Sequence, residues 1–162
     1  MEKSDYRKFL YLATFCRNKI TIPIIAIIAL VGSLLLNWSL YQLNLTAIIL
    51  YWLFFFALAL GTVCFKVERK NKVRIKTDLT GTFDSLNILT FYEDKVVMEN
   101  DLLKSTAELK YNQFFSVLES KDYFIFYLTA NQASLIRKKD VDSFDEFKQF
   151  LMNIFKDSYK HI

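Results

Sequence analysis

One uninterrupted stretch of 46 residues, between Lys19 and Lys66, contains no charged side chain. A helix needs about 20 apolar residues to cross the hydrocarbon of a bilayer, so this stretch is long enough to cross twice. It is too long for the apolar core of a signal peptide and lacks a small-x-small cleavage site. Its locally polar part is SLYQLNLT, at 39–46. We therefore expect a membrane α-helical hairpin over residues 20–65, with helices at about 21–41 and 45–65.

The charges on either side of this stretch predict its orientation. Residues 1–76 carry eleven Lys/Arg and three acids, a net charge of +8, whereas residues 77–162 carry ten Lys/Arg and fourteen acids, a net charge of −4. The cations flank both outer ends of the hairpin and are absent from its turn, which is the positive-inside pattern. We expect a multi-pass protein of the cell membrane with both termini cytoplasmic. Nucleic acid is excluded as a partner because the part expected to form a soluble domain is acidic.

The segment KVERKNKVRIK, at 66–76, is interpreted as a basic juxtamembrane linker. Its cations lie where anionic lipid headgroups would be, so the lipid bilayer is the expected contact. The alternative is that these charges only orient the helices. The candidate headgroup contacts are Lys66, Arg69, Lys70, Lys72, Arg74 and Lys76.

Residues 1–19 and the hairpin itself provide two further expectations. The first segment places Tyr6, Phe9 and Leu10 on one helical face, which is typical of an amphipathic helix on the inner membrane surface. In the hairpin, small side chains would allow close approach of the two helices. The alternative is that small residues have no packing role there. The candidate packing residues are Ala29, Ser33, Ala57 and Gly61.

Residues 77–162 are expected to form a cytosolic α+β domain. Alternating apolar residues separated by turn signals predict strands near 85–92, 96–100, 106–111, 114–119 and 134–139. The continuous aromatic run at 123–129 predicts one more strand, covered on both sides. The period then changes to that of a helix over 143–159, which opens with Ser143 and Glu146 as a capping box. We therefore expect an antiparallel sheet or barrel of five to seven strands with one C-terminal helix, an arrangement that resembles a pleckstrin-homology-like (PH-like) fold.

Three stretches of this domain resemble the YcxB-like family of small bacterial membrane proteins. They are LTFYEDKVVMEN (89–100), ELKYNQFFSVLESKDYFIFYLTANQASLIRKKDV (108–141) and SFDEFKQFLMNIF (143–155). Arg137 stands where the family usually has Pro. The matching positions are apolar ones that determine a fold, so the resemblance implies architecture and a bacterial membrane location and brings no active-site residues.

Catalytic chemistry is not expected. The single His161 lies beside the C-terminus, and the two cysteines, Cys16 and Cys64, form no CxxC pair and have no nearby His. No nucleophile–base pair or nucleotide-binding motif is visible. We expect a non-enzyme without cofactor or metal.

Two functions remain open. The first is a membrane-anchored interaction module: an adaptor, a regulator or an immunity-type self-protection factor. Its partner would be another protein or a second copy of this chain. The alternative is a sensor of anionic lipid headgroups at the inner membrane surface. A membrane enzyme with an unfamiliar site is a third, weaker reading.

Overall fold

A computed structural model describes residues 1–39, 44–79, 83, 85–130 and 132–162. The chain divides into two compact units, Glu2–Leu79 and Thr80–Ile162. We call them the helical unit and the β unit. Residues 40 and 41, at the end of the first predicted span, lie outside the described residues.

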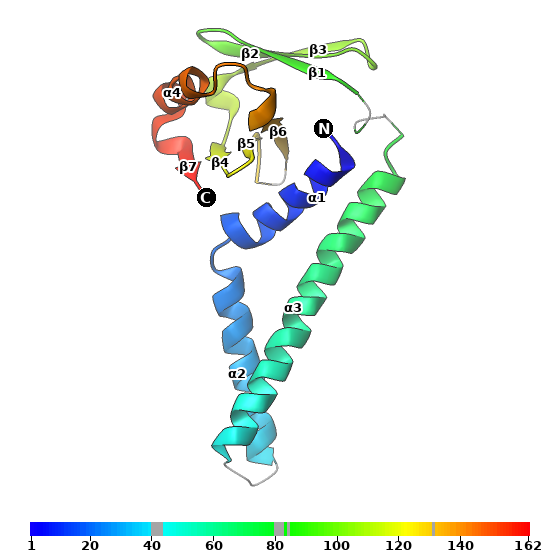
Figure 1. Cartoon of the computed structure of the whole chain (residues 1–162), viewed down its shortest axis with the longest axis vertical. Coiled ribbons are helices and arrows are strands. Elements are labelled where there is room, and N and C mark those ends of the chain that lie inside the picture. The colour runs from blue at the N-terminus through cyan, green and yellow to red at the C-terminus, as the bar shows by residue number, and fades with distance from the viewer. Residues whose placement is uncertain (40–43, 80–82, 84, 131) are drawn as a thin grey trace. The chain divides into compact units, whose positions relative to one another are not determined.

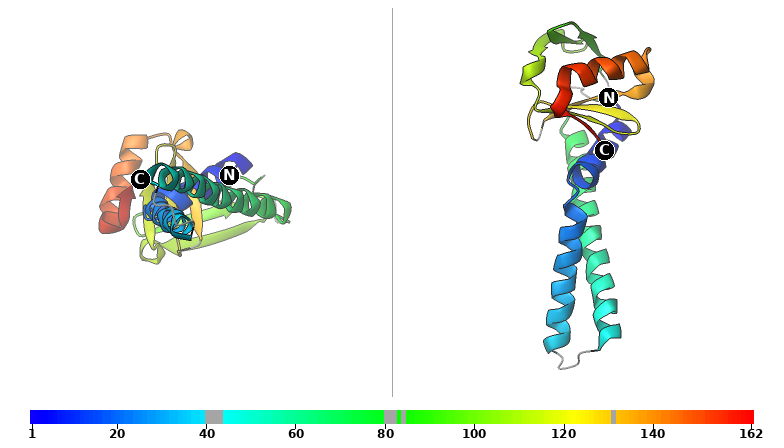
Figure 2. Two further views of the ribbon diagram at one scale, coloured as in Figure 1. Left: turned by 90° about the horizontal axis from the view of Figure 1, so that it is seen from below. Right: turned by 90° about the vertical axis from the view of Figure 1, so that its left-hand side faces the viewer.

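The helical unit contains α1 (Lys3–Tyr11), a π-helical turn η1 (Leu12–Arg17), α2 (Thr21–Ser39) and α3 (Leu45–Lys76). Helices α2 and α3 run side by side (Figures 1 and 2), and both are long and apolar enough to span a membrane. Pro23 is tolerated because it lies in the first turn of α2, where backbone N–H groups have no partner within the helix. The predicted starts of both helices, at 21 and 45, are confirmed.

The prediction of a linker at 66–76 is wrong, because α3 continues as one helix to Lys76. Lys and Arg are good helix formers, and no Gly or Pro interrupts the segment. The charged residues are therefore a helical extension of the second apolar span.

The contact between α2 and α3 follows one face of α2. Every fourth residue of that face is buried: Ile25, Ala29, Ser33 and Asn37. Two hydrogen bonds cross between the helices: the Ser33 hydroxyl donates to the carbonyl of Ile48 at 2.6 Å, and the Trp52 indole donates to the carbonyl of Ala26 at 3.0 Å. Polar bonds of this kind help helices to pair where no water competes.

Ala57 and Gly61 do not take part in this contact. Both are exposed, and a Cβ placed on Gly61 would meet nothing within 4 Å. The close approach occurs instead at Gly32, where an added Cβ would lie 3.6 Å from the ring of Phe55. The expectation for Ala57 and Gly61 fails because matching depth in a hairpin does not determine which face of a helix points inward.

The β unit contains two sheets, of which the first is antiparallel and the second is mixed. The first sheet has the order β1 (Asn87–Phe91), β2 (Lys95–Asn100), β3 (Ser105–Lys110). The second sheet has the order β6 (Ala133–Arg137), β5 (Tyr123–Tyr127), β4 (Ser116–Glu119), β7 (Tyr159–His161), in which β7 runs parallel to β4. Each of the six strands predicted from the sequence is present, and each begins within two residues of its expected start.

The core of the β unit is largely aromatic. It lies between the two sheets and is closed on one side by α4 (Phe144–Phe155), as Figure 1 shows. Phe91 of β1 contacts the ring of Phe147 on α4, with ring centroids 4.9 Å apart, and Phe126 of β5 at 5.9 Å. Leu151 and Phe124 are fully buried. The phenylalanines that recur along this helix therefore belong to the core: Phe144, Phe147, Phe150 and Phe155.

Three details of the β unit differ from expectation. The helix ends at Phe155, and the residues after it form a short 3-10 turn and the strand β7. Ser143 occupies the N-cap position of α4 but makes no side-chain capping bond, so the predicted capping box is wrong. The seven described strands form two sheets of three and four rather than one continuous sheet.

Candidate functional site

The basic extension of α3 presents one continuous face. Counted from Lys66, the residues of this face stand at i+3 and i+4, at i+7 and i+8, and at i+11: Arg69, Lys70, Val73, Arg74 and Thr77. Side chains at these spacings lie on the same side of a helix. Four of the six predicted headgroup contacts therefore share a face.

Helix α1 packs beside this extension and is held there by Glu68. Arg7 Nε donates to Glu68 Oε1 at 2.7 Å, and the Tyr11 hydroxyl donates to the same oxygen at 2.9 Å. The hydrogen bond to Glu68 raises the pKa of Tyr11. Leu10 of α1 and Val67 of α3 are buried in this unit. Glu68 is the acidic residue within the basic segment 66–76, and Arg7 neutralises its charge.

An open groove of about 420 Å³ lies along the same face of α3. It is lined by Tyr6 of α1 and by Lys66, Arg69, Lys70, Val73, Arg74 and Thr77. Burial raises the pKa of Tyr6, and the nearby charge of Arg74 partly opposes this. Lys72 and Lys76 do not line the groove. Tyr6 was predicted as part of an apolar face but not as a site residue; the groove depends on how α1 docks, which the sequence does not specify.

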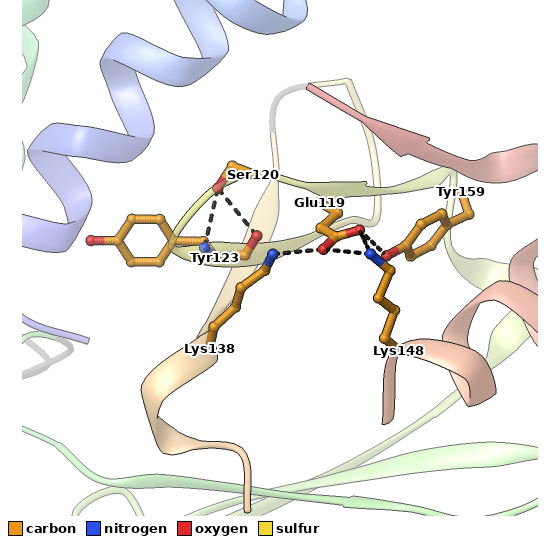
Figure 3. A network of polar contacts seen from close by, with 6 residues as sticks. All are labelled: Glu119, Ser120, Tyr123, Lys138, Lys148 and Tyr159. Carbon is orange, nitrogen blue, oxygen red and sulfur yellow. Dashed lines mark hydrogen bonds and ion pairs between the residues drawn. The ribbon is translucent and has the colours of Figure 1, made fainter. Parts of the chain in front are cut away.

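A second polar cluster lies inside the β unit, around Glu119 at the end of β4. Figure 3 shows Lys138, Lys148 and Tyr159 converging on its carboxylate. Lys138 Nζ lies 2.6 Å from Oε1, Lys148 Nζ lies 3.1 Å from Oε2, and the Tyr159 hydroxyl donates to Oε2 at 2.7 Å. The Glu119 side chain is only 2% exposed. We call these four residues the Glu119 cluster.

The environment of Glu119 keeps it ionised. Burial raises its pKa, but the hydrogen bonds from Lys138, Tyr159 and Lys148 outweigh burial and lower the pKa to about 2. Burial and the bond to Glu119 raise the pKa of Tyr159. A carboxylate with so low a pKa is a poor general base near neutral pH. The cluster joins β4 to β7, to α4 and to the residue after β6.

Ser120 shapes the turn that follows. Its hydroxyl accepts from the backbone N–H of Tyr123 at 3.1 Å, and its own N–H donates to the carbonyl of Tyr123 at 2.9 Å. Together, Glu119 and Ser120 give a structural role to the ES pair in the stretch that resembles the YcxB-like family.

A third feature is an exposed apolar end of the first sheet. Leu86, just before β1, is 66% exposed, and Ile88 within β1 is 47% exposed. In the turn between β2 and β3, Leu102 is 61% exposed and Leu103 is 51% exposed. Asn100 holds this end together. Its amide nitrogen donates to Asn87 Oδ1 at 2.6 Å and to Ser85 Oγ at 3.1 Å, while its oxygen accepts from the N–H of Leu103 at 2.8 Å. We call Leu86, Ile88, Leu102 and Leu103 the apolar end.

Metal ligation has no visible basis in the described part of the chain, where no group of three or more His, Cys, Asp or Glu residues could hold an ion. Cys16 and Cys64 are both free thiols.

These features define a class of protein: a small α+β domain on a chain whose other unit has two helices long and apolar enough to span a membrane. Residues 91–151 match the family model described as YcxB-like protein. The family predicted from the sequence stretches is therefore confirmed, and the domain is YcxB-like. No curated protein and no solved structure matches the chain.

Proposed function

We propose that this protein is a membrane-anchored, non-enzymatic interaction module that presents its YcxB-like domain at the cytoplasmic face of the cell membrane. Helices α2 and α3 would form the anchor as a multi-pass hairpin. The cations that flank both outer ends of the hairpin support an orientation with both termini cytoplasmic. The two interhelical hydrogen bonds and the buried face of α2 support pairing within one chain.

The apolar end is the observation that carries the interaction role. Four large apolar side chains are exposed together at one end of a packed domain, and Asn100 fixes the turn that presents two of them. Isolated exposed apolar residues need no explanation, but several gathered on an ordered surface are typical of a binding site. A rigid turn also loses little conformational freedom on binding.

We infer that the partner is a protein that binds in an extended conformation along β3. This strand is at the edge of its sheet and is exposed along most of its length. An added strand would bond to its free backbone groups, and Leu102 and Leu103, just before the strand, would provide apolar contacts. The protein would act as an adaptor or regulator by binding this partner through its PH-like domain. An immunity-type self-protection factor is a narrower form of the same role.

In-cell photo-crosslinking of the full-length protein tests this proposal. A photo-reactive amino acid at Leu103 is expected to capture one dominant protein partner in stoichiometric yield. The same reagent at Lys121, in the turn between β4 and β5, is the control and is expected to capture little. Leu102→Ser combined with Leu103→Ser should abolish the crosslinks made from Leu86. Phe115→Ser, which changes an exposed apolar residue outside the apolar end, should not. Absence of any protein adduct from the apolar end would contradict the proposal.

A second function is supported by the basic groove: contact with anionic lipid headgroups. The groove begins one residue beyond Phe65, the last apolar residue of the uncharged stretch, where the headgroup layer would start. Four cations there favour anionic lipid over neutral lipid. Reconstitution of the full-length protein into bilayers of mixed lipids tests it, because anionic lipids should be enriched around the protein at low salt and less so at high salt.

A further inference from the structure

We propose that the groove between α1 and α3 is a specific site for a lipid headgroup that carries two phosphate groups. This inference rests on the second proposed function and deepens it by naming the ligand class. Two modes of headgroup binding must be distinguished. In the first, all six cations of the extension attract anionic lipid diffusely; in the second, the four cations that line the groove bind one headgroup.

The charge of the groove favours a doubly charged ligand. Its lining contains four cations, Lys66, Arg69, Lys70 and Arg74, and no acid. Glu68, the acid within the basic extension, is already bound to Arg7 at 2.6 Å. A single phosphodiester would leave most of this positive charge unbalanced, whereas two phosphates would neutralise about half of it. Arg side chains also bind phosphate oxygens in pairs, which adds geometric specificity.

The depth of the cations matches the thickness of the headgroup region. From Lys66 to Arg74 the helix rises about 12 Å at 1.5 Å per residue. The headgroup layer of one leaflet is about 5–8 Å thick, so the three cations nearest Phe65 lie within it. Arg74 stands about one turn further out and can reach back along the groove with its long side chain. The cations therefore follow the direction in which a large headgroup would project.

The groove is open to solvent, and its walls combine basic and apolar side chains. Its volume of about 420 Å³ falls in the range of pockets for small ligands. Tyr6 forms one wall, Val73 provides an apolar surface between the basic side chains, and the Arg7–Glu68 ion pair keeps α1 in place. The groove therefore exists only where α1 is docked.

The test uses two variants that differ only in which lysines are neutralised. Lys66→Gln with Lys70→Gln removes two groove cations, and Lys72→Gln with Lys76→Gln removes two cations of the same type from the same helix outside the groove. Full-length protein in dodecyl maltoside is titrated with cardiolipin, which has two phosphates, or with phosphatidylglycerol, which has one, and bound lipid is counted by native mass spectrometry. Inorganic pyrophosphate is offered alone to test a soluble diphosphate.

We expect one cardiolipin per chain, bound about tenfold more tightly than phosphatidylglycerol. The groove variant should lose about tenfold or more in affinity, because each charge-assisted bond contributes about 1.5–3 kcal/mol, and about 1.4 kcal/mol corresponds to tenfold. The matched variant should lose less than about threefold. Tryptophan fluorescence melting of both variants should match the parent, because all four lysines are exposed.

Each other result overturns the inference in a distinguishable way. Equal losses in the two variants would mean diffuse attraction, which removes the groove site but keeps the lipid-contact function. Equal affinity for the two lipids would remove the two-phosphate assignment. Tight binding of pyrophosphate would remove the lipid. No effect of either variant would remove the lipid-contact function as well, while the protein-interaction role would remain to be judged by crosslinking.

Discussion

Lys138 Nζ lies 2.6 Å from Oε1 of Glu119, and it also lies 5.2 Å and 5.0 Å from the ring centroids of Phe124 and Phe144. One ammonium group thus meets a buried carboxylate and two aromatic faces. Both interactions favour the charged lysine. The residue links the end of the second sheet to the aromatic core and to the start of α4.

Glu119→Gln is expected to destabilise the β unit by about 3 kcal/mol, because removal of one member of a buried ion network leaves the others uncompensated. Denaturant titration of the full-length protein in detergent, followed by far-UV circular dichroism, measures the change. Glu108→Gln is the control: it breaks the exposed ion pair with Lys95, at 2.8 Å, and should shift the transition little. A similar denaturation midpoint for the two variants would show that the Glu119 cluster contributes no more to the stability of the β unit than an exposed ion pair does.

Stability should also depend on pH through Glu119. The folded-state pKa of about 2 is below the ordinary value of 4.5, so the ionised cluster adds stability above about pH 4.5 and loses it as the pH falls toward about 2. The free energy of unfolding of the parent minus that of Glu119→Gln should therefore shrink between about pH 6 and about pH 3. A difference that stays constant over this range would mean that Glu119 is not the responsible group.

In the helical unit, Ser33→Ala should weaken the α2–α3 contact by about 1 kcal/mol through loss of the bond to Ile48. Thermal unfolding in detergent, followed by tryptophan fluorescence, reports on this unit because both tryptophans, Trp38 and Trp52, lie in its helices. Gly61→Ala serves as the control and should not lower the transition, since a Cβ there meets nothing within 4 Å and Ala favours a helix over Gly. Destabilisation by Gly61→Ala would restore the packing role first expected for that residue.

Asn100→Ala should loosen the apolar end. Three hydrogen bonds of its side chain are lost, and we expect a cost of about 1–2 kcal/mol to the β unit. Partner crosslinking from Leu103 should fall more than this loss of stability explains, because the turn is no longer held in one conformation. Amide hydrogen exchange at residues 101–104 would measure the loosening directly. Unchanged crosslinking with faster exchange would mean that a fixed turn is not needed.

The proposed orientation predicts the accessibility of the β unit. In a variant with Cys16→Ser and Cys64→Ser, a single Asp122→Cys replacement provides an exposed thiol between β4 and β5. A membrane-impermeant maleimide should label it only after the cells are opened. A second variant with the thiol at Asn44, the N-cap of α3 in the hairpin, should be labelled in intact cells. Reversed labelling would overturn the cytoplasmic placement.

Local patterns were enough to predict most elements of this fold. The period of two in residues 85–139 and the helical period after Ser143 correspond to the observed strands and to α4. These patterns are reliable because an aromatic or aliphatic side chain on the wrong face would be left in water. The strand β7 was not predicted, since three residues are too few to show a period and its partner β4 is distant in the sequence.

The sequence by itself determined the two long apolar helices, the division of charge at residue 76 and the strand-rich domain, because length, charge and periodicity are local properties of a chain. Tertiary structure decided which faces meet. It placed Ser33 against Ile48 while Gly61 points outward, docked α1 on Glu68 to form the basic groove, and gathered Lys138, Lys148 and Tyr159 around Glu119. Those contacts join residues up to 61 positions apart. They depend on the rotation and crossing of packed elements, which no local pattern contains.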